Sequence, residues 1–279
     1  MTITLDGKAL AAHLEIALLP RVEAFKKRHG YAPVLATILV GSDLSSATYV
    51  RMKGNACRRV GMASKAIELP ESATTADVLA VIDALNADSR AHGILLQHPV
   101  PRHVDERRCF DHIHVAKDVD GVTSHGFGKM ALGEPAFGSA TPAGVMRLLA
   151  HYNLPIEGKL AVVVGRSPIL GKPMALMLSN ANATVTLCHS KTADLEAAVR
   201  SAEIVVAAIG KPRFIQSHWI SNGAVVVDAG YHPGGIGDVD HDGLMGRCAA
   251  LTPVPGGVGP MTISTLIGHT LAAAEQSIA

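Results

Sequence analysis

The sequence predicts an α/β protein of two domains with a cleft between them. Its 279 residues are near twice the length of a typical domain, and 48% of them are hydrophobic, enough to bury two substantial cores. Short apolar runs typical of buried strands alternate with stretches of helical periodicity. This alternation is typical of doubly wound parallel sheets.

Six apolar runs are predicted to be buried strands. They are the segments 34–40, 93–97, 159–165, 184–188, 203–210 and 224–230. Seven other stretches have the spacing of helices. They are 8–22, 45–60, 75–89, 142–152, 171–181, 192–201 and 261–275. Pro20 is expected to kink or end the first of these helices, because proline lacks the amide proton that an inner helical turn needs.

Segments rich in Gly, Ser and Pro indicate where the chain passes between domains. One is 121–141, which lacks a clear period, and the other is 252–260, which precedes the final amphipathic helix. That helix is expected to return to the first domain. We therefore expect one domain of residues 1–139 plus 262–279 and a second domain of residues 140–261.

Composition argues against several classes of protein. The formal net charge is +1 with His neutral, so no basic face for nucleic acid is expected. The apolar N-terminal stretch contains Asp6, Lys8 and Glu15, which fits neither a signal peptide nor a membrane span. The four cysteines are far apart, with no CxxC pair. They are Cys57, Cys109, Cys188 and Cys248. We expect a cytoplasmic protein with reduced thiols and no membrane partner.

Residues 162–178 run from an apolar strand through a glycine loop into a helix, where a dinucleotide pyrophosphate would bind. Gly165 and Gly171 would let the backbone approach the anion, and the helix start is expected to supply free N–H groups. Ser167 stands where the usual fingerprint has its second glycine, so an ordinary strand-to-helix turn is the alternative.

The strand at 184–188 is followed by His189, Ser190 and Lys191. NAD enzymes carry a carboxylate at this point for the ribose 2′-hydroxyl. A hydroxyl and a cation suit a 2′-phosphate instead, and Arg166 in the loop would add a bidentate contact. The pattern favours NADP over NAD, with a solvated polar strand end as the alternative.

The first half of the chain contains five residues whose side chains could take part in binding or catalysis. Tyr49 and Lys53 are four apart and share one helix face, although such pairs are usually surface pairs. Gln97 ends an apolar strand, where ligands bind in open sheets. Asp118 and Asp120 precede a glycine, so one would face the cleft while the other supports the turn, with a role in the turn alone as the alternative.

A metal site is not expected. His112 and His114 lie close in sequence, but no carboxylate or thiol cluster stands near them at ligand spacing.

Eight motifs resemble, in order, those of the bifunctional methylenetetrahydrofolate dehydrogenase/cyclohydrolase family. They are TYVRMK (48–53), GILLQHP (93–99), KDVDG (117–121), ATPAG (140–144), GRSPILGKP (165–173), CHSKT (188–192), GKP (210–212) and TPVPGGVGPMT (252–262). The resemblance implies NADP-dependent oxidation of 5,10-methylenetetrahydrofolate and hydrolysis of the 5,10-methenyl product to 10-formyltetrahydrofolate. It also implies a homodimer joined through its cofactor domains.

The resemblance further implies roles for particular residues. Lys53 matches the catalytic lysine, Gln97 the amide that orients it, Tyr49 the aromatic that stacks on the p-aminobenzoate, and Asp120 the carboxylate that binds the pterin. Further substrate contacts are expected at Pro255, Gly256, Gly257, Gly259 and Pro260. The expected NADP contacts are Gly165, Arg166, Ser167, Ile169, Gly171, His189, Ser190, Gly210, Tyr231 and Thr262.

Three positions depart from the residues common in the family. His98 replaces Leu, Ala140 replaces Cys and Tyr231 replaces Ile. His98 would add a titrating group beside Lys53, and Tyr231 bears on cofactor affinity. The competing hypotheses are a monofunctional dehydrogenase and a non-catalytic folate-binding or nucleotide-binding paralogue. The presence of Lys53, Gln97 and Asp120 together argues against both.

Overall fold

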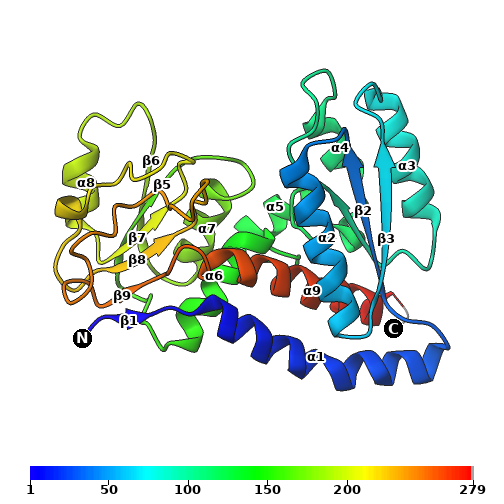
Figure 1. The fold of residues 1–279 in the computed structure, drawn as a ribbon, viewed down its shortest axis with the longest axis horizontal. Coiled ribbons are helices and arrows are strands. Elements are labelled where there is room, and N and C mark those ends of the chain that lie inside the picture. The colour runs from blue at the N-terminus through cyan, green and yellow to red at the C-terminus, as the bar shows by residue number, and fades with distance from the viewer. Residues whose placement is uncertain (278–279) are drawn as a thin grey trace. The chain divides into compact units, whose positions relative to one another are not determined.

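The computed structural model describes residues 1–277, with side chains at all of these positions except 44 and 45. Their contacts form two compact units, each with a parallel sheet (Figure 1). Unit 1 contains Met1–Ala11 and Thr141–Thr262, and unit 2 contains Ala12–Ala140 and the described residues from Ile263 onward. The predicted two-domain α/β class with parallel sheets is confirmed.

The first eleven residues are grouped differently from the expected division. Strand β1 (Ile3–Thr4) pairs with β9 (Ala250–Leu251), and the Ile3 N–H donates to the Ala249 carbonyl over 2.8 Å. The N-terminal residues are therefore part of the sheet of unit 1. Strands of two residues have no alternation to read, which is why the sequence did not reveal this pairing.

The sheet of unit 2 has the order β3-β2-β4, with all strands parallel. The strands are β2 (Val34–Val40), β3 (Ala63–Leu69) and β4 (Gly93–Leu96). The helices that contribute to this unit are α1 (Gly7–His29), α2 (Leu44–Arg59), α3 (Thr75–Ala87), α4 (Glu106–His112), η1 (Val115–Lys117), α5 (Ser124–Ala131) and α9 (Val258–Gln276). Leu266 and Ile267 of α9 join Leu35 and Leu95 of the sheet in one core, so the expected return of the final helix is confirmed.

Helix α1 continues through Pro20 to His29, so the end of the helix at Pro20, one of the two outcomes expected, is wrong. The amide that Pro20 lacks would have bonded the carbonyl of Ile16, a residue that is 65% exposed, so water can replace the lost partner. The unit boundary follows Ala140, within the segment 121–141 that was expected to join the domains, although this segment also contains α5.

The sheet of unit 1 has six strands in the order β1-β9-β8-β7-β5-β6. Besides β1 and β9 it contains β5 (Leu160–Val164), β6 (Thr184–Cys188), β7 (Ile204–Ala207) and β8 (Val225–Asp228). The helices of this unit are α6 (Ala140–His151), α7 (Gly171–Asn180), α8 (Leu195–Ser201) and η2 (Ser217–Trp219). Helices α7 and α8 lie on opposite sides of the strands (Figure 1). The chain therefore reverses direction across the sheet between β5 and β7, which creates a topological switch point.

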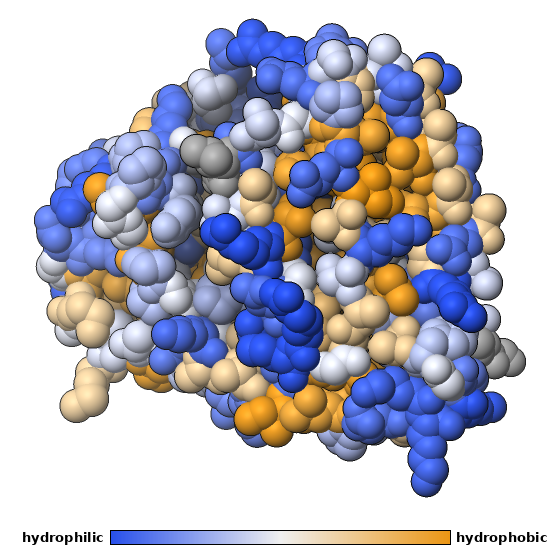
Figure 2. Space-filling view, turned by 45° about the vertical axis from the view of Figure 1, so that its right-hand side comes forward, coloured by the Kyte–Doolittle hydropathy of each residue, from blue (hydrophilic) through white to orange (hydrophobic). Residues whose placement is uncertain are grey.

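On the face shown in Figure 2, polar side chains (blue) alternate with apolar ones (orange), which gather at the upper right and in smaller areas along the lower margin. Within the described residues, no helix combines the length and apolar character that a membrane span requires.

Candidate active site

Lys53 and Gln97 form a buried hydrogen bond in unit 2. Lys53 Nζ donates to Gln97 Oε1 over 3.0 Å. At the other end of the same amide, Gln97 Nε2 donates to the carbonyl of His98 over 2.7 Å. Because both ends of the Gln97 amide are bonded, its oxygen is held toward the lysine.

The topology explains how residues 44 positions apart meet. Lys53 lies in α2, which follows β2, and Gln97 directly follows β4, the neighbour of β2. The chain goes from β2 to β3 on one side and then crosses to β4 on the other. The carboxyl ends of β2 and β4 thus flank a switch point, the usual place for a ligand in an open α/β sheet.

The surroundings of Lys53 disfavour its charged form. Burial lowers the pKa of Lys53, and attraction by Asp120 only partly opposes this effect. Burial also raises the pKa of Asp120, against the influence of Lys53. The site therefore holds an amine that loses its proton more readily than an ordinary lysine, as a base near neutral pH must.

Asp118 and Asp120 have different surroundings. The Asp118 carboxylate is buried and accepts the N–H of Val122 over 3.0 Å and that of Thr123 over 2.9 Å. Asp120 contributes its backbone carbonyl to the loop, where it accepts the N–H of Ala140 over 3.0 Å. The structure thus assigns the turn to Asp118 and leaves the Asp120 carboxylate as the candidate for a ligand.

Tyr49 lies one helical turn before Lys53 on α2, and the residue is 36% exposed. Residues four apart lie on the same helix face. The structure therefore presents an accessible phenol ring on the face that also carries the buried amine.

A second pair near Gln97 was not anticipated from the sequence. His98 Nδ1 lies 2.6 Å from Glu106 Oε1, and the same oxygen accepts the N–H of Val100 over 3.3 Å. The hydrogen bond to Glu106 raises the pKa of His98, while burial opposes it. The only available signal was Asp105 and Glu106 at the start of a helix, which does not indicate a histidine partner.

In unit 1, the loop after β5 has the close packing expected of a dinucleotide site. Gly165 has φ +127°, and a Cβ there would lie 2.0 Å from the Ala208 carbonyl oxygen, after β7. A Cβ on Gly171 would lie 2.0 Å from the carbonyl oxygen of Gly165. Only glycine fits at either position, so the loop and the start of α7 come together at the switch point.

The start of α7 differs from the expectation of free N–H groups. The N–H groups of Leu170 and Gly171 donate to Ser167 Oγ over 3.2 and 3.3 Å, and that of Lys172 donates to the Ser167 carbonyl over 3.1 Å. The expectation is therefore wrong for these three amides. Ser167 closes the loop on itself, and Ile169 lies half-buried within it.

The sheet register places the polar residues after β5 and β6 at the same edge. Val164 pairs with Cys188, so Arg166 and Ser190 each follow the paired position by two residues. Both side chains are exposed, and so is that of Lys191. His189 supports the turn, because its Nδ1 accepts the Lys191 N–H over 3.1 Å.

The loops after β7 and β8 meet at a buried carboxylate. Asp238 accepts the N–H groups of Ile209, Gly210 and Lys211 over 2.6, 2.8 and 3.0 Å. This arrangement holds Gly210, whose φ is +72°. Tyr231 follows β8 by three residues and is 60% exposed.

The segment 252–260 is assigned to unit 1 by its contacts, and with it the five predicted substrate residues Pro255, Gly256, Gly257, Gly259 and Pro260. The Gly256 carbonyl accepts the Lys8 N–H over 2.8 Å. A Cβ on Gly257 would lie 2.7 Å from the Pro253 carbonyl oxygen. Thr262 Oγ1 lies 3.1 Å from Thr141 Oγ1.

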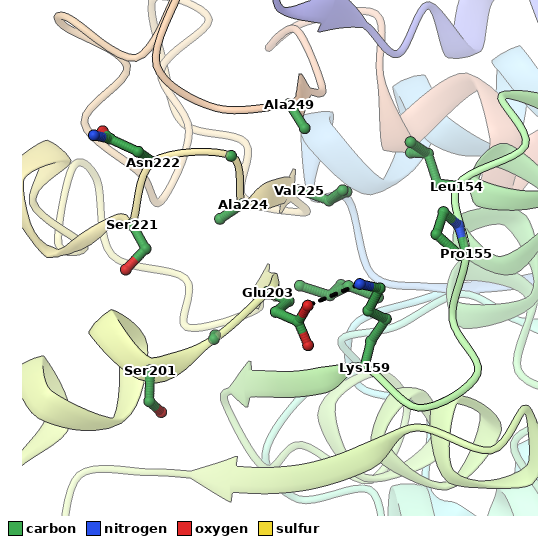
Figure 3. Close-up of a pocket in the computed structure, with 13 residues that line it drawn as sticks. Leu154, Pro155, Lys159, Ser201, Glu203, Ser221, Asn222, Ala224, Val225 and Ala249 are labelled. Atoms are coloured by element: carbon green, nitrogen blue, oxygen red, sulfur yellow. Dashed lines mark hydrogen bonds and ion pairs between the residues drawn. The ribbon is translucent and has the colours of Figure 1, made fainter.

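A cavity of about 340 Å³ lies at the amino ends of the strands of the six-stranded sheet, away from the loops after β5 and β6 (Figure 3). Lys159 and Glu203 border it and form an ion pair of 2.8 Å (Figure 3). Because these residues precede β5 and β7, the cavity lies at the amino ends of the strands, where open α/β sheets do not bind nucleotides. Within residues 1–277, no three His, Cys, Asp or Glu side chains are grouped to hold a metal ion.

Comparison with protein families finds two matches that together span most of the chain. Residues 5–120 match the catalytic domain of tetrahydrofolate dehydrogenase/cyclohydrolase. Residues 139–278 match the NAD(P)-binding domain of the same family.

Individual relatives are similar over nearly their full length. A bifunctional protein FolD from Acidobacterium capsulatum is 67% identical over 99% of this chain and 98% of its own. The crystal structure of the Campylobacter jejuni bifunctional enzyme FolD superposes with a TM-score of 0.96 at 41% identity, covering 99% of each chain. The Trypanosoma brucei enzyme, solved with NADP and an inhibitor, gives a TM-score of 0.94 at 35% identity, covering 99% of this chain and 98% of its own.

Proposed function

The chain belongs to the tetrahydrofolate dehydrogenase/cyclohydrolase family, and we propose that it oxidises 5,10-methylenetetrahydrofolate with NADP and hydrolyses the 5,10-methenyl product to 10-formyltetrahydrofolate. The observation that carries the proposal is the buried Lys53–Gln97 hydrogen bond. A monofunctional dehydrogenase has no need of an oriented base, and a non-catalytic paralogue has no need of either residue.

Lys53 is proposed to act differently in the two half-reactions. Loss of hydride from the methylene carbon leaves a cation shared by the two flanking nitrogens. A charged ammonium beside that carbon would oppose the step, whereas a neutral amine does not. The burial that lowers the pKa of Lys53 therefore assists oxidation.

In hydrolysis the neutral amine is proposed to be the general base. As a water oxygen bonds to the methenyl carbon, its proton passes to Lys53 Nζ. The carbinol oxygen then loses its remaining proton to solvent as the C=O bond forms and the bond from carbon to N5 breaks. N5 takes up the proton held by Lys53, and the formyl group stays on N10. Gln97 Oε1 holds one N–H of the lysine and so directs the nitrogen lone pair toward the substrate.

Asp120 and Tyr49 are proposed to position the folate. The aminopyrimidinone ring offers adjacent N–H donors, which a carboxylate accepts in pairs as it accepts a guanidinium. Asp120 suits this role because Asp118 already supports the turn. The accessible ring of Tyr49 is proposed to stack on the p-aminobenzoate group.

The loop after β5 fits a dinucleotide, since Gly165 and Gly171 provide the close approach that a side chain would prevent. When bound, NADP accepts the hydride. Arg166 and Ser190 are proposed to bind its 2′-phosphate, because the register places both at one sheet edge. The remaining proposed contacts are Ser167, Ile169, His189, Gly210, Tyr231 and Thr262.

We also propose a cytoplasmic homodimer that supplies one-carbon units for purine biosynthesis. All four cysteines are buried and unpaired, as suits a reducing compartment. Strand β6 is an edge of the six-stranded sheet and is available for contact with a second copy. Light scattering of the purified protein should give twice the monomer mass of 29.1 kDa.

The proposal is tested by incubating purified protein with NADP and 5,10-methylenetetrahydrofolate. NADPH should form, and added methenyl compound should decay faster than in buffer. NADPH formation without faster decay would support the monofunctional alternative, and neither change would support the non-catalytic one.

A further inference from the structure

The surroundings of Gln97 contain a chain of hydrogen bonds that the proposed reaction does not yet explain. It runs from Glu106 through His98 to Gln97 and ends at Lys53. The successive distances are 2.6 Å from Glu106 Oε1 to His98 Nδ1, 2.7 Å from the His98 carbonyl to Gln97 Nε2 and 3.0 Å from Gln97 Oε1 to Lys53 Nζ.

Glu106 holds the segment that follows β4 at two points, His98 and Val100. One of its oxygens bonds both the His98 ring and the Val100 N–H, two residues apart on the segment after β4. Glu106 is itself held by α4, whose first turn is capped by Asp105 through the Arg108 N–H at 3.0 Å. A fixed helix end thus determines where the His98 carbonyl lies, and that carbonyl orients Gln97.

We propose that His98 and Glu106 are positioning residues for the hydrolytic half-reaction, acting on Lys53 through Gln97. This inference rests on the proposed function, because it assumes that Lys53 is the base. His98 thereby receives a role that differs from that of a second base.

The hydrogen bond does not depend on the charge of His98. An ionised Glu106 only accepts, so His98 Nδ1 carries a proton in both the neutral and the charged ring. Burial raises the pKa of Glu106, but the hydrogen bond and charge of His98, the Val100 N–H and the charge of Arg107 together outweigh it, so the net pKa is lowered. The charged groups that act on this pair are Asp120 and Arg107, and Lys53 acts on Asp120.

The test compares four single variants and the double variant His98→Ala/Glu106→Ala in steady-state hydrolysis of methenyltetrahydrofolate. His98→Ala and Glu106→Ala remove either end of the bond. His98→Asn retains a donor at the place of Nδ1 but cannot titrate. Asp83→Asn is the matched control. Asp83 Oδ1 lies 2.6 Å from His112 Nε2, as close as Glu106 lies to His98, and this pair is not part of the chain of hydrogen bonds that leads to Gln97.

Both alanine variants should lower kcat for hydrolysis by about tenfold while leaving KM within about twofold, as for a base displaced by a fraction of an ångström. The double alanine variant should be no slower than either one. His98→Asn should recover most of the rate with one inflection in its pH profile, and Asp83→Asn should match wild type.

The inference is overturned if the alanine variants hydrolyse at the wild-type kcat, or if His98→Asn is as slow as His98→Ala. A rise in KM as large as the fall in kcat, together with an equal fall in the rates of oxidation and hydrolysis, would also overturn it. Such a result indicates general damage to the fold. Wild-type protein that hydrolyses no methenyl compound would refute the proposed function instead. The same assay therefore separates the two failures.

Discussion

Asp118 and Asp120 are two residues apart, yet of their carboxylates only that of Asp118 accepts N–H groups of the turn that follows, those of Val122 and Thr123. This difference makes Asp120 the candidate for pterin recognition.

Asp120→Asn should abolish most folate binding while NADP binding persists. The change retains size, but it removes the charge and turns one acceptor into a donor that faces the N–H groups of the pterin. Calorimetry with each ligand separately measures this. Asp118→Asn is the control, and it should lower the melting temperature because a buried carboxylate that accepts two amides is lost. Unchanged folate affinity in Asp120→Asn would exclude the pterin role.

Arg166, whose side chain is exposed, should determine the preference of the protein for NADP over NAD by binding the 2′-phosphate. NADP should bind more tightly than NAD by about 2 kcal/mol, the scale of a charge-assisted contact. Arg166→Ala should narrow that gap, whereas Arg200→Ala on α8, which removes an exposed arginine of the same unit, should leave it unchanged. Equal turnover of wild type with both dinucleotides at low concentration would contradict the assignment.

Gly165→Ala should damage the cofactor unit. The added Cβ would lie 2.0 Å from the Ala208 oxygen at a backbone φ of +127°. A loss of roughly 2 kcal/mol or more in stability is expected from the combined clash and strain. Gly128→Ala, in α5 with open space around it, should instead stabilise its helix by about 0.5–1 kcal/mol. Thermal melting and NADP titration of both variants check this, and a wild-type result for Gly165→Ala would refute the close approach.

The pH dependence of hydrolysis should report Lys53. The neutral amine is the base, so the rate is low below its pKa and rises as the pH passes through it. Because burial lowers this pKa, the rise should be centred below the value of about 10.4 of an ordinary lysine. Stopped-flow decay of methenyltetrahydrofolate at graded pH, corrected for the uncatalysed rate, gives the profile. A rise centred at the ordinary lysine value would exclude a desolvated base.

The sequence was sufficient to predict the elements with strong apolar patterns. Strands β2 and β6 were predicted with their observed bounds, and the other four predicted strands differ from the observed ones only at their ends. Strand β3 was missed because it is an edge strand whose ASKAIEL sequence is mostly exposed and lacks an apolar run. Pro20 does not end α1, because the exposed helix face tolerates the missing bond.

The residues of the candidate site could be predicted from the sequence, but the contacts between them could not. Lys53 and Gln97 could be singled out, yet their hydrogen bond depends on the β3-β2-β4 order, which no local pattern specifies. The division of roles between Asp118 and Asp120 likewise required hydrogen bonds to the backbone. Glu106 was missed because its partnership with His98 depends on the path of the turn between β4 and α4.

The most direct test of the account is the effect of Lys53→Met on the two half-reactions, with the exposed Lys65→Met on β3 as its control. The change retains the apolar stem and removes the amine. Hydrolysis should fall by at least about 10²-fold, the loss typical of a general base, while oxidation falls less and methenyltetrahydrofolate accumulates. If Lys53→Met hydrolyses the methenyl compound at the wild-type rate after subtraction of the uncatalysed reaction, Lys53 is not the base.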